Sequence, residues 1–170
     1  MDKLKESRHG RPVAELHPLV VHLPIGVLLV YPFLELAAAI LKRRDVAMVA
    51  MGLLGVAAIA TLVATTTGEA AYMEAEAAGF GHELLESHEE LAEKLPWMVL
   101  ALLAARVYGA LKTSFGAWIG AIGGFVLIAV VVQVGHSGGK LVYDHGVGVK
   151  AVQRAPDAQG HEREPHSTDP

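Results

Sequence analysis

The chain has 170 residues, of which 52% are hydrophobic and 19% charged, and its formal net charge at pH 7 is −4. It contains no cysteine, which excludes disulfides, iron–sulfur clusters and haem attachment through a C-x-x-C-H motif. The slightly acidic balance gives no reason to expect a nucleic-acid partner. The apolar residues are gathered into long runs, which indicates a protein embedded in a lipid bilayer.

The first sixteen residues form a polar tail of mixed charge, and an apolar run follows over residues 18–41. At a rise of ~1.5 Å per residue a helix over this run measures about 36 Å, enough to cross a bilayer with some tilt. The run is too long and too heavily flanked for a removed signal peptide, so we expect a retained span. Pro24 and Pro32 lie inside it and should each kink or loosen the helix.

A second apolar run covers residues 46–67 and is rich in alanine, glycine and threonine, which lets helices approach closely in lipid. The segment that follows, residues 69–94, is polar and carries eight glutamates. From His82 onward its apolar positions recur at helical spacing. This pattern predicts an amphipathic helix that continues into a third span over residues 95–111.

A fourth apolar run covers residues 115–135, with glycines every three or four positions that favour close packing. We expect the glycine-rich residues 136–149 to form an ordered turn against the bundle, and residues 151–170 to form a disordered polar tail. The predicted fold is therefore all-α. It is an integral membrane four-helix bundle over residues 17–150, whose third helix has an amphipathic extension.

Six histidines fall at one end of this predicted bundle. With four spans, the starts of the first and third helices and the ends of the second and fourth share one side of the membrane with both chain termini. The histidines on that side are His17, His22, His82, His88, His136 and His145. Two more, His161 and His166, belong to the polar tail, and we assign them no role.

Neutral imidazole is the commonest side-chain ligand for haem iron, copper and zinc. Without cysteine a haem would be non-covalent and of the b type, with histidine axial ligands. Because the first and third helices are diagonal in an up-and-down bundle, we expect His22 and His88 to face each other as the axial pair. His136 and His145 are alternative ligands or hydrogen-bond partners of the ligands. His17 is either a further ligand or a cap for the first helix.

Two other interpretations stay open beside a b-type haem that transfers electrons. In one, no cofactor binds, and the histidines and glycines only shape the end of a structural or binding subunit. In the other, the same histidines handle a copper or zinc ion. We identify no catalytic residue, and none of the three interpretations needs a stand-alone enzyme. The expected partners are the lipid bilayer and, for a redox subunit, other redox proteins in the membrane or periplasm.

Glu35 and Arg106 form a separate polar feature inside the first and third spans. Both lie about 10 Å into the bilayer from the end opposite the histidines, at ~1.5 Å per residue. A charge at that depth is unfavourable unless it is paired. We therefore expect an ion pair that joins the two helices, and the alternative is a proton or ion relay.

The loop charges give an orientation. The two short loops carry four basic residues, whereas the segment 68–94 carries a single lysine. The positive-inside rule then places the short loops in the cytoplasm and both termini on the periplasmic side of a bacterial inner membrane. The amino-terminal tail opposes this assignment with four basic residues of its own.

Two sequence motifs resemble a known family. The stretch HPLVVHLPIG at residues 17–26 matches H-P-x-x-V-H-x-P-I, and GHSGGKLVYDHGVGV at residues 135–149 matches G-x-x-G-G-x-L-V-Y-x-x-G-V-x-V. Together they resemble the bacterial membrane-protein family called domain of unknown function 2231, over roughly residues 15–150. The resemblance implies four spans and no established activity. An association of some members with redox proteins favours the haem interpretation, and Glu35 and Arg106 are not part of the pattern.

Overall fold

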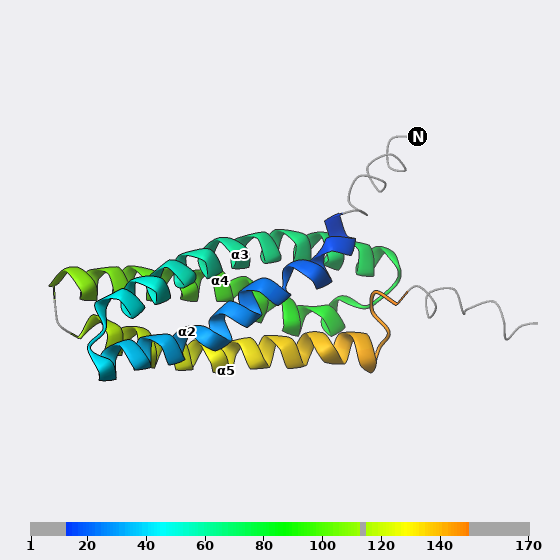
Figure 1. Ribbon diagram of the computed structural model, residues 1–170. Helices are drawn as coiled ribbons and strands as arrows, with labels where there is room; N and C mark the ends of the chain where they lie inside the picture. Colours follow the sequence, from blue (N-terminus) through cyan, green and yellow to red (C-terminus); the bar gives the residue numbers. More distant parts are fainter. Residues whose placement is uncertain (1–12, 113–114, 150–170) are drawn as a thin grey trace, which may run out of the picture.

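The computed structural model describes residues 13–112 and 115–149. Four helices run up and down in one elongated bundle (Figure 1). They are α2 (His22–Leu41), α3 (Arg44–Ala77), α4 (His82–Lys112) and α5 (Gly116–Tyr143). All four are long and apolar enough to cross a membrane. The prediction of an all-α four-helix bundle is confirmed.

Each helix packs against two others. α2 and α4 both contact α3 and α5, so α2 and α4 lie diagonally across the bundle from each other. The start of the first helix, the α3–α4 turn and the end of α5 lie together (Figure 1), and we call this the histidine end. The α2–α3 and α4–α5 connections lie at the other end, which we call the distal end.

The first helix begins before α2. A helical rod runs from Val13 to Leu41 and is interrupted at Val21, where a turn separates residues 13–20 from α2. Pro24 accounts for the interruption, because it lacks an N–H group and its ring collides with the carbonyl four residues earlier. The helix therefore starts inside the predicted polar tail, the rest of which lies outside the described residues, as does the predicted tail over residues 151–170.

The helices extend well past the predicted spans at the histidine end. α3 continues to Ala77, and α4 starts at His82 and takes in the predicted amphipathic extension. α5 differs most from expectation, because it remains helical through the glycine-rich segment to Tyr143. The expected turn is shorter, covers residues 144–149, and has positive φ angles at Gly146 and Gly148.

The core is apolar and draws a large side chain from every helix. Leu28, Leu54, Val99 and Leu127 are almost fully buried and contact one another through one cluster. Other large apolar residues lie on the outside, including Leu29, Ile59, Ile122 and Val132. An outer surface of this kind is compatible with lipid and not with water.

Candidate functional site

Two histidines point inward at the histidine end. His17 comes from the helical segment before α2, and His88 comes from the second turn of α4. Both residues are partly buried, and each ring bonds to a neighbouring helix, His17 to Thr67 of α3 and His88 to Ser137 of α5. Side chains from the two diagonal elements of the bundle therefore face inward at the same end.

The His17 ring lies on α3. Its Nδ1 atom is 3.1 Å from Oγ1 of Thr67. The next residue, Gly68, lies directly beneath the ring, and a Cβ atom added there would be 3.0 Å from Cε1 of His17. Thr67 thus holds the ring, and Gly68 leaves the space for it.

The His88 ring lies on α5 in the same way. Its Nδ1 atom is 2.9 Å from Oγ of Ser137. A Cβ atom at Gly138 would be 3.0 Å from Cε1 of His88. The close approach explains why α5 tolerates glycine inside its helix, since the ~1 kcal/mol penalty of a helical glycine is offset by packing.

The hydroxyl groups also bond to their own helices. Thr67 Oγ1 donates to the carbonyl of Ala64 over 3.0 Å, and Ser137 Oγ donates to the carbonyl of Val134 over 3.0 Å. A hydroxyl that gives its single proton to a carbonyl accepts from its histidine, and this assignment places the proton of each neutral ring on Nδ1. In that tautomer Nε2 is the basic nitrogen, the atom with which imidazole binds a metal.

The two histidine sites are repeats of each other. Thr67-Gly68 recurs seventy residues later as Ser137-Gly138, and the buried positions of α3 and α5 follow the same offset. These matched pairs are Ala50 with Gly120, Leu54 with Gly124, and Ala57 with Leu127. His17 precedes Glu35 by eighteen residues, as His88 precedes Arg106. This internal spacing is the sequence signal that identifies Thr67 and Ser137, which motif reasoning had missed.

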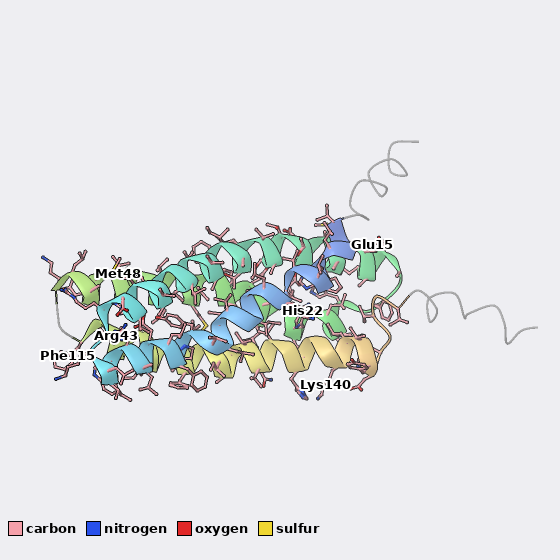
Figure 2. All side chains as sticks on the ribbon, viewed as in Figure 1. Glu15, His22, Arg43, Met48, Phe115 and Lys140 are labelled. Carbon is pink, nitrogen blue, oxygen red and sulfur yellow. The ribbon has the colours of Figure 1, made fainter. Side chains whose placement is uncertain are left out.

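The other histidines lie outside this pair. His22 is exposed on α2 (Figure 2), because five residues of α-helix place it about 140° around the rod from His17. His136 and His145 are also exposed. His82 is exposed and contacts Tyr72 and Glu76 near the α3–α4 turn. Of the two histidines predicted to face each other, His88 faces inward and His22 does not, and His17 is the histidine of the first helix that faces inward.

Glu35 and Arg106 meet near the distal end. Arg106 donates through Nε to Oε1 of Glu35 over 2.6 Å, and the hydroxyl of Tyr31 donates to the same oxygen over 3.3 Å. Both charged side chains are almost fully buried. Oε2 of Glu35 has no hydrogen-bond partner among the described residues. The close approach of α5 completes the site, since a Cβ atom at Gly120 would be 2.6 Å from Cδ of Glu35.

The two polar layers are separated. Leu28, Val99 and Leu127 of the apolar cluster occupy the length of bundle between the histidines and the Glu35–Arg106 pair. A chain of hydrogen-bonding groups is needed to carry a proton from one layer to the other. Among the cluster members Tyr31 carries a hydroxyl group, which binds Glu35, and the others are aliphatic. The buried hydroxyl of Thr61 bonds to its own helix, so the two polar layers are separated by a mainly aliphatic stretch of the bundle.

Within residues 13–112 and 115–149, no three histidine or carboxylate side chains lie close enough to form a metal site.

The comparisons with known proteins agree with the motifs. A family model described as a predicted membrane protein, DUF2231, matches residues 14–151. No curated protein matches the chain, and no solved structure matches it. The matched range contains all four helices and both histidine sites. The chain belongs to the DUF2231 family of membrane proteins.

Proposed function

We propose that this protein is a membrane redox subunit that holds a b-type haem between His17 and His88. The supporting observation is that each ring is held at Nδ1 by a hydroxyl group of a neighbouring helix, Thr67 for His17 and Ser137 for His88, an arrangement that leaves Nε2 to act as the ligand atom. Hydrogen-bonded imidazoles of this kind are typical of metal-ligating histidines. A haem bound there would supply one-electron transfer.

The residues of the chain would orient and shield the ligands. Thr67 and Ser137 keep each ring in one tautomer and one orientation, and the helical glycines let α3 and α5 approach the rings closely. The apolar cluster beneath the pair excludes water on the side toward the middle of the bundle. A shielded site of low polarity shifts the reduction potential of a bound haem away from its value in water.

We infer the partners from the position of the pair. It lies at the end of the bundle where the first helix starts and α5 ends (Figure 1), and we assign this end to the periplasmic side of a bacterial inner membrane from the loop charges. Redox proteins of the membrane or the periplasm would therefore exchange electrons with it. The protein would act as a subunit and not as a stand-alone enzyme.

Purification from cells that are well supplied with haem tests the proposal. A Soret band with sharp α and β bands after reduction is expected for the natural sequence and for His22→Ala and His145→Ala, whose parent side chains are exposed. His17→Ala and His88→Ala should each lose the low-spin spectrum while still inserting into the membrane, because alanine is a good helix former.

Two other results would support the alternatives. Copper or zinc in mass-spectrometric metal analysis, lost in the same two variants, would identify an ion-handling protein. If neither haem nor metal co-purifies, or if His22→Ala alone removes the spectrum, the His17–His88 haem site is wrong. A cofactor-free structural subunit is then the better description.

A further inference from the structure

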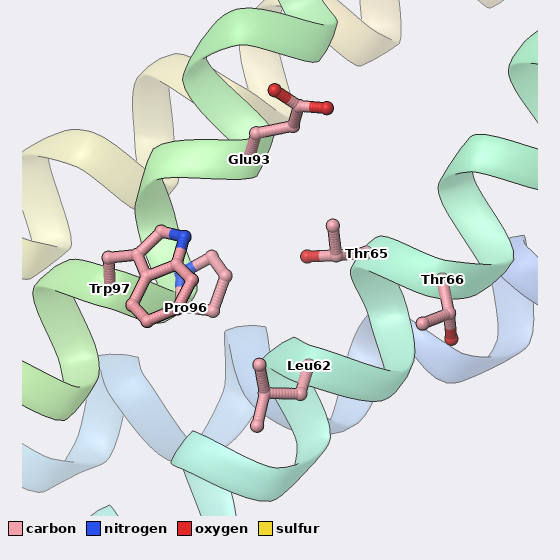
Figure 3. Close-up of a pocket in the computed structure, with 6 residues that line it drawn as sticks. All are labelled: Leu62, Thr65, Thr66, Glu93, Pro96 and Trp97. Carbon is pink, nitrogen blue, oxygen red and sulfur yellow. The ribbon is translucent and has the colours of Figure 1, made fainter.

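A groove opens on the outside of the bundle between α3 and α4 (Figure 3). Its volume is about 350 Å³. Six residues line it, and they are Leu62, Thr65, Thr66, Glu93, Pro96 and Trp97. Neither His17 nor His88 lines it, so the groove is distinct from the histidine pair.

The groove is polar at one end and apolar at the other along the bundle axis. α3 runs toward the histidine end, so Leu62 lies about 5 Å deeper in the bilayer than Thr65 and Thr66, at ~1.5 Å per residue. α4 runs in the opposite direction, so Trp97 lies about 6 Å deeper than Glu93. This gradient follows the membrane normal and matches an amphiphile with its headgroup outward.

The polar end consists of hydrogen-bond acceptors. Thr65 donates its hydroxyl proton to the carbonyl of Thr61 over 3.0 Å, and Thr66 donates to Val63 over 2.9 Å. Each hydroxyl therefore retains only its lone pairs for a ligand.

Glu93 supplies a negative charge to the groove. The neighbouring Lys94 reaches Glu90 over 3.4 Å, and Glu93 makes no ion pair within the described residues. Trp97, one turn further along α4, is 70% exposed and borders the same groove. The face of an indole ring attracts a cation, because the negative end of its quadrupole points out of the ring plane.

We propose that this groove binds the headgroup ammonium of an aminophospholipid, with Glu93 and the face of Trp97 holding the charge. The hydroxyl oxygens of Thr65 and Thr66 accept its N–H groups, and an acyl chain lies along Leu62 and Pro96. A primary ammonium fits all of these groups. An anionic headgroup meets repulsion from Glu93, and a quaternary ammonium has no proton to donate to the threonines.

Native mass spectrometry of the full chain tests the site. The protein is released from micelles that contain phosphatidylethanolamine, phosphatidylglycerol and phosphatidylcholine in equal amounts. Preferential retention of phosphatidylethanolamine is expected. Glu93→Gln should weaken that retention about tenfold, which corresponds to ~1.4 kcal/mol. Glu90→Gln is the matched control, because it removes the same charge from the same helix at a carboxylate already paired with Lys94.

A second measurement places the lipid in the groove. In a Trp118→Phe background Trp97 is the remaining tryptophan, so phosphatidylethanolamine with brominated acyl chains should quench its fluorescence, and Glu93→Gln should reduce the quenching. Equal retention of the three lipids, or identical behaviour of Glu93→Gln and Glu90→Gln, would overturn the proposal. Thermal unfolding of the two variants should coincide, which separates lost binding from lost folding.

Discussion

Arg106 donates through Nε to Oε1 of Glu35 over 2.6 Å, and this bond joins two helices that lie diagonally across the bundle. α2 and α4 make no extensive packing contact with each other. The ion pair therefore connects α2 and α4 directly, where the other contacts of the core run between neighbours. Its burial makes it sensitive to the loss of either partner.

Replacing either member of the pair should destabilise the protein. Breaking a buried pair in soluble proteins lowers the free energy of unfolding by ~3–5 kcal/mol. The penalty of a mid-helix charge on insertion scales is ~2.5–3.5 kcal/mol, so we expect a loss of about 3 kcal/mol for Glu35→Leu and for Arg106→Leu. Unfolding in detergent measures it.

The double variant distinguishes a pair from two separate sites. With both charges removed, no group is stranded, and part of the loss should be recovered. If the two losses simply add, the residues do not depend on each other. Glu35, whose Oε2 lacks a protein partner among the described residues, would then be better explained by a water-filled cavity and proton exchange.

Gly120→Ala should also destabilise this layer. The added methyl group would lie 2.6 Å from Cδ of Glu35 and 2.7 Å from the hydroxyl of Tyr31, and overpacking of this kind typically lowers stability by ~1–3 kcal/mol. Gly52→Ala is the control, since no atom lies within 4 Å of the new methyl group. It should be neutral or stabilising, because alanine favours a helix by ~1 kcal/mol over glycine. Equal effects would show that α5 does not approach Glu35 this closely.

Loss of the Ser137 hydroxyl should weaken the proposed haem site without removing a ligand. In Ser137→Ala the Nδ1 proton of His88 loses its hydroxyl acceptor, and changes to such supporting groups typically lower metal affinity ~10–100-fold. Haem retention during dilution measures the effect. Ser87→Ala, at an exposed position next to His88, should retain haem normally. Equal retention in the two variants would mean that Ser137 does not orient the ring.

Reporter fusions test the arrangement in the membrane. A fusion at Arg44, in the α2–α3 connection, should report the side opposite to one placed after Val149. A fusion at Gly79, between α3 and α4, should agree with Val149, because both lie at the histidine end. Agreement between Arg44 and Val149 would contradict four spans.

Hydropathy was sufficient to predict the four helices, because a run of apolar residues long enough to cross lipid is a strong signal. It could not predict how each helix is rotated. The core and the lipid are both apolar, so the sequence gives little contrast between inward and outward faces. His22 was therefore expected to face inward, whereas the structure turns it outward and places His17 inside.

The extent of α5 was missed for a different reason. Glycine disfavours a helix by ~1 kcal/mol relative to alanine, so a segment with Gly135, Gly138 and Gly139 is predicted to form a turn. In the structure the ring of His88 packs against Gly138. This is a tertiary contact with α4, some fifty residues earlier in the chain, so the local sequence could not reveal it. The depth of Glu35 and Arg106 in the bilayer, in contrast, could be predicted, because it requires only a count of residues from the nearest helix end.

The repeated hairpins carry opposite charges at the equivalent positions Glu35 and Arg106. If α2–α3 and α4–α5 were separate chains, pairing like with like would bury two carboxylates or two guanidinium groups together. Only the mixed assembly neutralises them, so the ion pair selects its partner as well as joining two helices. When the chain is divided at Gly79 and the two halves are co-expressed, we therefore expect each half to assemble with the other half and not with a second copy of itself. Arg106→Glu in one half should abolish that recovery, and its rescue by Glu35→Arg would show that charge alone decides which hairpins assemble.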